Sequence, residues 1–149
     1  MKNLFFKSLD KIILALLTIF GFANCDMPME YGAPYADFEI NGTVTDSLTS
    51  NPVQNIRVIK QNPKNSVFGD TVYTDAAGKY KFSFQDFPEQ TPQFTLKAED
   101  MDGTANGGEF TTRNVIVTIV ESDWVDDGDD NWYYGKAKKT QNIKLQSKK

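Results

Sequence analysis

Apolar and polar residues alternate along most of the chain after residue 37, which is the pattern of β-strands with one buried face. In FEINGTVTD, residues 38–46, the side chains of Phe38, Ile40 and Val44 fall on one face and polar residues on the other. Four later segments place apolar residues on one face in the same way: Ile56 and Val58; Tyr80, Phe82 and Phe84; Phe94, Leu96 and Ala98; and Ile143 and Leu145. We predict that these segments are strands around one core.

Three further segments complete the predicted sheets. Residues 113–121, RNVIVTIVE, are apolar on both faces and should form a central strand. Residues 67–74 and 132–138 have a weaker strand pattern, and the basic tail 136–149 is interpreted as a solvated edge strand with a frayed end. Turn sequences rich in Asn, Asp, Gly and Pro separate nearly all of these segments, and no helical period follows residue 25. The predicted fold is all-β, a single sandwich of seven to eight antiparallel strands.

The first 24 residues have a different character. Lys2, Lys7 and Lys11 precede an uncharged apolar run at residues 12–23. This run is shorter than the roughly 20 residues of a transmembrane helix, but it suits the hydrophobic part of a secretory signal peptide. A buried core helix is the alternative, and an all-round apolar run behind lysines at the N-terminus argues against it. We therefore interpret residues 1–24 as a cleaved signal peptide.

Cys25 is the only cysteine, and the chain contains no histidine. An intrachain disulfide is therefore impossible, and one thiolate cannot hold zinc. The segment Phe22-Ala23-Asn24-Cys25 resembles the lipobox of bacterial lipoproteins, although that pattern usually has Leu at position 22 and Gly or Ala at position 24. The resemblance implies a diacylglycerol on the sulfur, whose two acyl chains hold a protein firmly in a membrane. We predict lipidation of Cys25; a plain secretory signal with a leftover thiol is the alternative.

The predicted mature chain is divided into a spacer at 25–37 and a sandwich domain at 38–149. Removal of residues 1–24 takes away three lysines and one aspartate, so the formal charge of −4 becomes about −6. This negative net charge argues against nucleic acid as a partner.

The predicted location is the cell envelope, on the outer membrane or cell surface rather than the inner membrane. The basic tail at 136–149 could also contact anionic lipid headgroups, but its interpretation as a solvated edge strand is favoured.

Three successive segments carry a recognisable pattern: GTVTD at 42–46, PV and IRV within 52–58, and TDAAGKYKF at 74–82. They resemble carboxypeptidase regulatory-like domains, which are transthyretin-like sandwiches of seven strands. In this interpretation Gly42 lets a neighbouring chain approach, Pro52 starts the second strand, and Gly78 closes a tight turn with a positive φ. These residues determine the fold and carry no chemistry.

Longer segments at 30–46, 100–110 and 123–145 are similar to the radical-SAM-associated lipoproteins in the same order. That family covers a signal peptide, an anchor cysteine, a YG-x-P segment and a sandwich. The resemblance implies a radical SAM protein encoded nearby as a partner, and it supplies no catalytic residue. One hypothesis is therefore that this chain is a substrate which such an enzyme modifies.

Catalytic chemistry is not predicted, because the usual base and nucleophile are missing without a histidine or a free thiol in the mature chain. Two acidic loops could instead offer oxygen ligands to calcium, the one cofactor that we consider. The alternative is that they are solvated loop tips. The candidate calcium ligands are Asp100, Asp102, Asp123, Asp126, Asp127, Asp129 and Asp130.

Four aromatic residues flank the second acidic loop and could bind a ligand: Trp124, Trp132, Tyr133 and Tyr134. Aromatic faces next to acids and amides serve in sugar binding and as protein hot spots. With a period of two, Trp132 and Tyr134 share one face, so at least half of the set should be structural. The leading hypothesis is a non-enzymatic, lipid-anchored envelope module with an interaction or structural role, for which an envelope protein or a glycan is the candidate partner. Its rival is a calcium-dependent module that binds carbohydrate or protein through the loop at 123–134.

Overall fold

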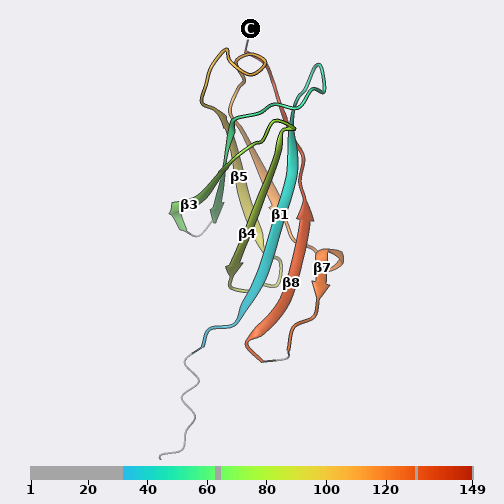
Figure 1. Cartoon of the computed structure of the whole chain (residues 1–149). Coiled ribbons are helices and arrows are strands. Elements are labelled where there is room, and N and C mark those ends of the chain that lie inside the picture. The colour runs from blue at the N-terminus through green and yellow to red at the C-terminus, as the bar shows by residue number, and fades with distance from the viewer. Residues whose placement is uncertain (1–31, 63–64, 130, 149) are drawn as a thin grey trace, which may run out of the picture. The chain divides into compact units, whose positions relative to one another are not determined.

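The computed structural model describes residues 32–62, 65–129 and 131–148, and they form an all-β sandwich (Figure 1). The predicted signal peptide, Cys25 and Asp130 lie outside these residues. The described part of the chain contains nine strands and one short 3-10 helix. Their bounds are β1 Tyr35–Asp46, β2 Ile56–Asn62, β3 Asn65–Tyr73, β4 Lys79–Asp86, β5 Gln93–Asp100, β6 Arg113–Thr118, η1 Glu121–Asp123, β7 Trp124–Asp126, β8 Tyr133–Thr140 and β9 Ile143–Leu145.

The strands are arranged in two sheets that enclose the core. The first sheet has the order β4-β1-β8-β7, with β9 paired to the far end of β1, and the second has the order β3-β2-β5-β6. Most pairs are antiparallel, as predicted, but β1 is parallel to both β8 and β9. Parallel neighbours need a long crossover connection, and the chain between β1 and β8 includes the whole second sheet.

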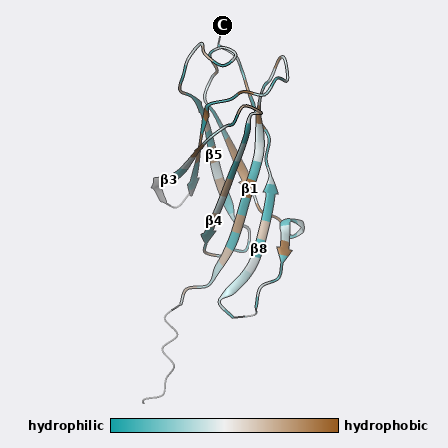
Figure 2. Ribbon diagram, in the orientation of Figure 1, coloured by the Kyte–Doolittle hydropathy of each residue, from teal (hydrophilic) through white to brown (hydrophobic). Residues whose placement is uncertain are grey.

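The alternating pattern of β1 explains why this strand lies at the centre of the first sheet. After the exposed Tyr35 its residues are alternately buried and half-buried, and Phe38, Ile40 and Val44 all point into the core as predicted. Figure 2 shows the corresponding alternation of hydrophilic and hydrophobic positions along the strand. Of the other predicted core residues, all are buried except Phe84, which is partly buried against the core.

One prediction about strand position is wrong, and a second is wrong in part. Residues 113–118 form β6, which lies at the edge of the second sheet and pairs only with β5. Of its outward side chains only Ile116 is apolar, and it is 67% exposed, whereas Val117 on the inner face is buried. The basic tail is an edge strand only in part: residues 136–140 belong to β8, which lies between β1 and β7, whereas β9 pairs with β1 alone. In addition, β1 begins at Tyr35, inside the predicted spacer, and Ala36 is already buried.

The turn residues predicted from the family resemblance are mostly confirmed. A Cβ atom on Gly42 would lie 1.8 Å from the carbonyl oxygen of Gln141, so this glycine does admit a neighbouring chain. Gly78 has a φ of 69° in the turn before β4. Pro52, by contrast, makes only an isolated bridge with Thr45, and β2 starts later, at Ile56.

Candidate functional site

The predicted acidic and aromatic loop joins β7 to β8 at the end of the sandwich where β1 begins. The backbone N–H of Tyr35 donates a hydrogen bond to the carbonyl of Trp132 at 2.8 Å. The rings of Tyr35 and Tyr133 pack with their centroids 5.3 Å apart, and the Tyr133 hydroxyl donates to Asp37 at 3.3 Å. The loop is thereby attached to the first residues of the described domain.

Gly135 makes the compact shape of this loop possible. Its φ of 98° lies in the region that favours glycine, and a Cβ atom there would lie 1.9 Å from the carbonyl oxygen of Asp126. Gly135 lies within a register shift between β1 and β8, where two steps on β1, from Tyr35 to Asp37, face three steps on β8, from Tyr133 to Lys136. The shift breaks the strict period of two on which the predicted faces of Trp132 and Tyr134 depended.

The four predicted ligand-binding aromatics separate into structural and exposed members. Trp124 packs edge-on against Phe38, with ring centroids 5.9 Å apart, and belongs to the core. Trp132 and Tyr133 are half-buried, whereas Tyr134 is 52% exposed. A pocket of about 190 Å³ is lined by Asp127, Asn131, Tyr133 and Tyr134 and brings predicted acidic and aromatic residues together.

The carboxylates of this loop mostly accept hydrogen bonds from the loop itself. Asp126 accepts from the N–H of Gly128 at 3.0 Å. Asp129 accepts from the N–H groups of Asn131 and Tyr133 at 3.1 and 3.2 Å. Asp127 has no hydrogen bond or ion pair to any other described residue, and its side chain is exposed. The loop thus uses its acids mainly to fix its own backbone.

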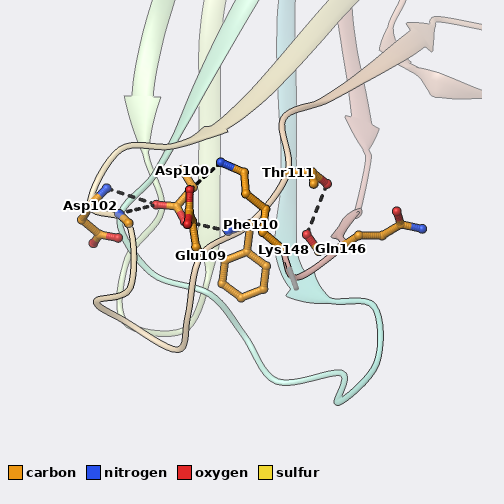
Figure 3. A network of polar contacts seen from close by, with 8 residues as sticks. Asp100, Asp102, Glu109, Phe110, Thr111, Gln146 and Lys148 are labelled. Carbon is orange, nitrogen blue, oxygen red and sulfur yellow. Dashed lines mark hydrogen bonds and ion pairs between the residues drawn. The ribbon is translucent and has the colours of Figure 1, made fainter.

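Asp100 and Asp102 lie at the opposite end of the sandwich, in the loop before β6 (Figure 3). The Asp100 carboxylate accepts from the N–H groups of Asp102, Gly103 and Phe110 at 3.1, 3.2 and 2.9 Å. Asp102 accepts from the side-chain amide of Asn55 at 2.8 Å and also from that of Asn106. Both acids hold the loop together.

The C-terminal segment closes this same end. Lys148 makes an ion pair with Glu109 at 2.6 Å, and its backbone N–H donates to the Glu109 carbonyl at 2.7 Å. The N–H of Thr111 donates to the carbonyl of Gln146 at 2.8 Å, and the Thr111 hydroxyl donates to the same carbonyl at 3.2 Å (Figure 3). Residues 109–111 and 146–148 are therefore bound to one another, and the end of the chain is not frayed within the described residues.

The remaining predicted calcium ligand, Asp123, lies apart from both loops at the edge of the first sheet. Burial tends to raise its pKa, but the ion pair with Lys139 at 2.7 Å and the N–H of Val120 lower it overall. The six predicted ligands among the described residues therefore do not converge. Within the ranges that the structure describes, no group of three or more His, Cys, Asp or Glu side chains could hold a metal ion.

Acid should weaken the loop at 100–110. Hydrogen bonds from Asn55 and Asn106 hold the pKa of the Asp102 carboxyl below its ordinary 3.8. A depressed pKa stabilises the fold above the ordinary value, and this stabilisation is lost as the pH falls through the folded-state pKa. We expect the thermal midpoint of Asp102→Asn to lie below that of the wild type at pH 7, and the difference to shrink below about pH 4.

Thermal unfolding monitored by circular dichroism between pH 2 and pH 7 measures this difference. Asp127→Asn is the matched control, because its carboxylate has no partner among the described residues. The interpretation is wrong if the Asp102→Asn difference stays constant over the whole pH range.

Sequence reasoning missed a groove of about 660 Å³ at the β4 edge of the first sheet. It is lined by polar residues of β1, β4 and the β8–β9 segment, among them Asn41, Thr43, Lys79, Thr140 and Asn142. Thr140 donates to Asn41 at 3.0 Å, and Asn142 accepts from the N–H of Thr43 at 3.0 Å. The period of two in the sequence does predict that the polar residues of β1 and β4 point outward. It does not predict which residues of β8 lie beside them, because that depends on the pairing of β8 with β1 in the tertiary structure.

The comparisons with known proteins support the fold. A scan against protein-family models found no match, and neither did a search of curated proteins. Among solved structures, the major pilin subunit BcpA of Bacillus cereus is similar with a TM-score of 0.50 and 14% identity, over 76% of this chain and 31% of that chain. Catechol 1,2-dioxygenase from Acinetobacter sp. ADP1 has the same TM-score with 13% identity, over 95% of this chain and 69% of that chain.

A candidate carbohydrate-binding protein from Bacteroides uniformis is also similar, with a TM-score of 0.41 and 14% identity, over 72% of this chain and 40% of that chain. This chain therefore spans less than a third of the pilin subunit and less than half of the Bacteroides protein. At these identities the likeness shows a β-sandwich and not an activity. No helix in the described part of the chain is long and apolar enough to cross a membrane.

Proposed function

We propose that this protein is a non-enzymatic β-sandwich module that is anchored to a bacterial envelope through lipid on Cys25. The position of the sandwich carries the proposal: β1 begins at Tyr35, ten residues after the only cysteine. The described domain is complete in itself, with a continuous core and no buried side-chain polar atom without a hydrogen-bond partner among its described residues. A folded body directly behind a short tether suits a structural or interaction role.

The tether would also set the orientation of the domain. Ten residues span at most about 35 Å when extended. The β7–β8 loop lies at the end where β1 begins, since Tyr35 bonds to Trp132 there. That loop would face the membrane, and the loop at 101–109, with the exposed Met101, would face away from it. In this arrangement partners from outside the cell meet the second loop first.

Lipid anchoring is tested by replacing the cysteine. Cys25→Ser should move the protein from the membrane fraction to the soluble fraction, because loss of the acyl chains removes the hydrophobic anchor. Intact mass spectrometry of the wild-type protein from native membranes should show a chain that begins at residue 25 and carries added acyl mass. Met27→Ser, in the same spacer, is the control and should stay in the membrane. A soluble wild-type chain that still begins at Met1 with a free thiol would refute the proposal.

The link to a radical SAM protein belongs to this proposal and is supported by the resemblance at 30–46, 100–110 and 123–145. The same intact-mass measurement tests whether the chain is a substrate. After cleavage and acylation are accounted for, a modified chain should show a residual mass difference, which peptide mapping would assign to a residue. A mass fully explained by cleavage and acylation contradicts the substrate hypothesis and leaves the anchored module intact.

The pocket beside the β7–β8 loop favours a second candidate function, the binding of a carbohydrate or protein with or without calcium. Its wall combines Asp127 with Tyr133 and the exposed Tyr134. An acid and an amide next to aromatic rings can hold sugar hydroxyls and a sugar face together. Glycan-array binding that disappears in Tyr134→Ala would support this function, and loss with a chelator would add calcium. Glycan binding that is unchanged in Tyr134→Ala would exclude this pocket as the binding site.

A further inference from the structure

The edge strand β6 has backbone groups that point away from its only partner. β6 pairs with β5 in the antiparallel register that places Val117 opposite Phe94 and Val115 opposite Leu96. In the same register the N–H of Ile119 donates to the carbonyl of Pro92 at 2.9 Å. Hydrogen-bonded pairs alternate in an antiparallel ladder, so Arg113, Val115 and Val117 direct their N–H and C=O groups toward β5. Asn114, Ile116 and Thr118 therefore direct theirs toward the free edge.

One end of this free edge is capped. Val120 donates its N–H to the Asp123 carboxylate at 2.9 Å, and its carbonyl accepts from the N–H of Asp123 at 2.9 Å. At the other end β6 begins at Arg113, whose guanidinium donates to the carbonyl of Lys144 at 2.7 Å. Within β6 the free edge therefore has three N–H and three C=O groups, at residues 114, 116 and 118.

This edge lacks the usual protection against strand pairing. Soluble proteins guard an open edge with lysines, prolines, bulges or inward-pointing charges. On β4, which is an edge of the first sheet, Lys79 and Lys81 supply such charges. Between residues 114 and 118 β6 has neither charge nor proline, and the Ile116 side chain at its centre is 67% exposed. An exposed isoleucine on an edge strand that has none of these protective features indicates that another strand pairs with the edge.

We propose that β6 pairs in antiparallel register with β6 of a second copy of this chain, about a two-fold axis at Ile116. In this register Ile116 faces the partner's Ile116, and Asn114 faces the partner's Thr118. All three N–H and all three C=O groups on each open edge would then be paired, giving six hydrogen bonds. The pairing joins the two second sheets into one continuous sheet of eight strands.

The side chains favour a second copy over an unrelated segment. The register keeps outward residues opposite outward residues and places Val115 opposite the partner's Val117 on the inner face, as the period of two requires. It brings two exposed isoleucines into an apolar cross-strand pair flanked by polar Asn–Thr pairs. The nearest charges, the Arg113 side chains, lie at opposite ends of the paired strands, so no like charges face each other.

The contact is small, and we expect a weak dimer in solution. It does not depend on the proposed lipid anchor, although confinement to one membrane would raise the effective concentration of the copies. A failure of lipidation and a failure of this pairing are therefore observed separately.

Disulfide cross-linking of the full chain in intact bacterial cells tests the register whether or not the chain is anchored. Opposite residues of a hydrogen-bonded antiparallel pair have Cα atoms about 5.5 Å apart, within the range that a disulfide spans. Ile116→Cys should give a band of doubled mass under oxidising conditions. Asn114→Cys alone should not, because two copies of residue 114 would lie more than 10 Å apart along the strands. Asn114→Cys co-expressed with Thr118→Cys should again give the dimer.

Tyr73→Cys is the matched control, since Tyr73 is 55% exposed on β3 at the other edge of the same sheet. The wild-type chain gives the background from Cys25. We expect about tenfold more dimer from Ile116→Cys than from Tyr73→Cys or Asn114→Cys. Equal cross-linking from Tyr73→Cys, no dimer from Ile116→Cys, or an Ile116→Cys adduct with a different protein would each overturn the proposal.

Discussion

Replacement of Phe38 by alanine is expected to lower the free energy of unfolding by about 3–5 kcal/mol. Phe38 is only 1% exposed and lies at the centre of an aromatic cluster formed by both sheets. Its ring centroid lies 5.5 Å from that of Phe84, 5.4 Å from that of Phe94 and 5.9 Å from that of Trp124. Truncation removes these ring contacts and leaves a cavity that the rigid sheets cannot close.

Chemical denaturation with urea measures this loss directly, and the thermal midpoint should fall by about 10 °C or more. Phe87→Ala is the matched control, because the same change at a residue that is 56% exposed should alter stability by less than about 0.5 kcal/mol. Equal destabilisation by the two variants would contradict the packing described for the core.

The second large effect is expected from Gly42→Ala, with a loss of about 3 kcal/mol. An added Cβ atom would lie 1.8 Å from the carbonyl oxygen and 2.6 Å from the carbonyl carbon of Gln141, and backbone atoms cannot rotate aside. The displacement would also disturb two hydrogen bonds. Gln141 donates its N–H to the Asn41 carbonyl at 2.7 Å, and the Tyr80 hydroxyl donates to the Gln141 carbonyl at 2.5 Å.

Ser83→Ala provides the control for Gly42→Ala. Ser83 lies on the adjacent strand β4 with its side chain exposed, so its loss should leave urea unfolding nearly unchanged. A Gly42→Ala variant as stable as the wild type would show that the β8–β9 connection does not press against β1 as the structure has it.

The strands were predictable wherever one face is buried and the other is polar. Phe38, Ile40 and Tyr80 were assigned to the core from the period of two alone, and all three are buried. The same reasoning failed for β6, because Ile116 and its apolar neighbours indicate burial on both faces in the sequence. The pattern of apolar residues reports neither whether a second layer covers the outer face of a sheet nor where a strand lies in the sheet.

The candidate site was less predictable than the fold. Asp123, Asp126 and Asp129 were grouped as candidate calcium ligands because they are close in the sequence. In the structure Asp123 forms an ion pair with Lys139, whereas Asp126 and Asp129 accept hydrogen bonds from backbone N–H groups. Trp124 was a candidate for ligand binding and instead packs on Phe38. The groove beside Lys79 depends on β8 lying next to β1, a contact between residues about a hundred positions apart.

The sequence by itself determined the all-β class and most of the buried faces, because these follow from local alternation, while the roles of Gly42 and Gly78 were predicted from the family resemblance of the segments around them. Only the tertiary structure decided that β1 runs parallel to β8 and β9, that the two acidic loops lie at opposite ends, and that β6 forms an open edge. Strand order depends on the balance of loop entropy and packing over the whole chain, and no local pattern encodes that balance.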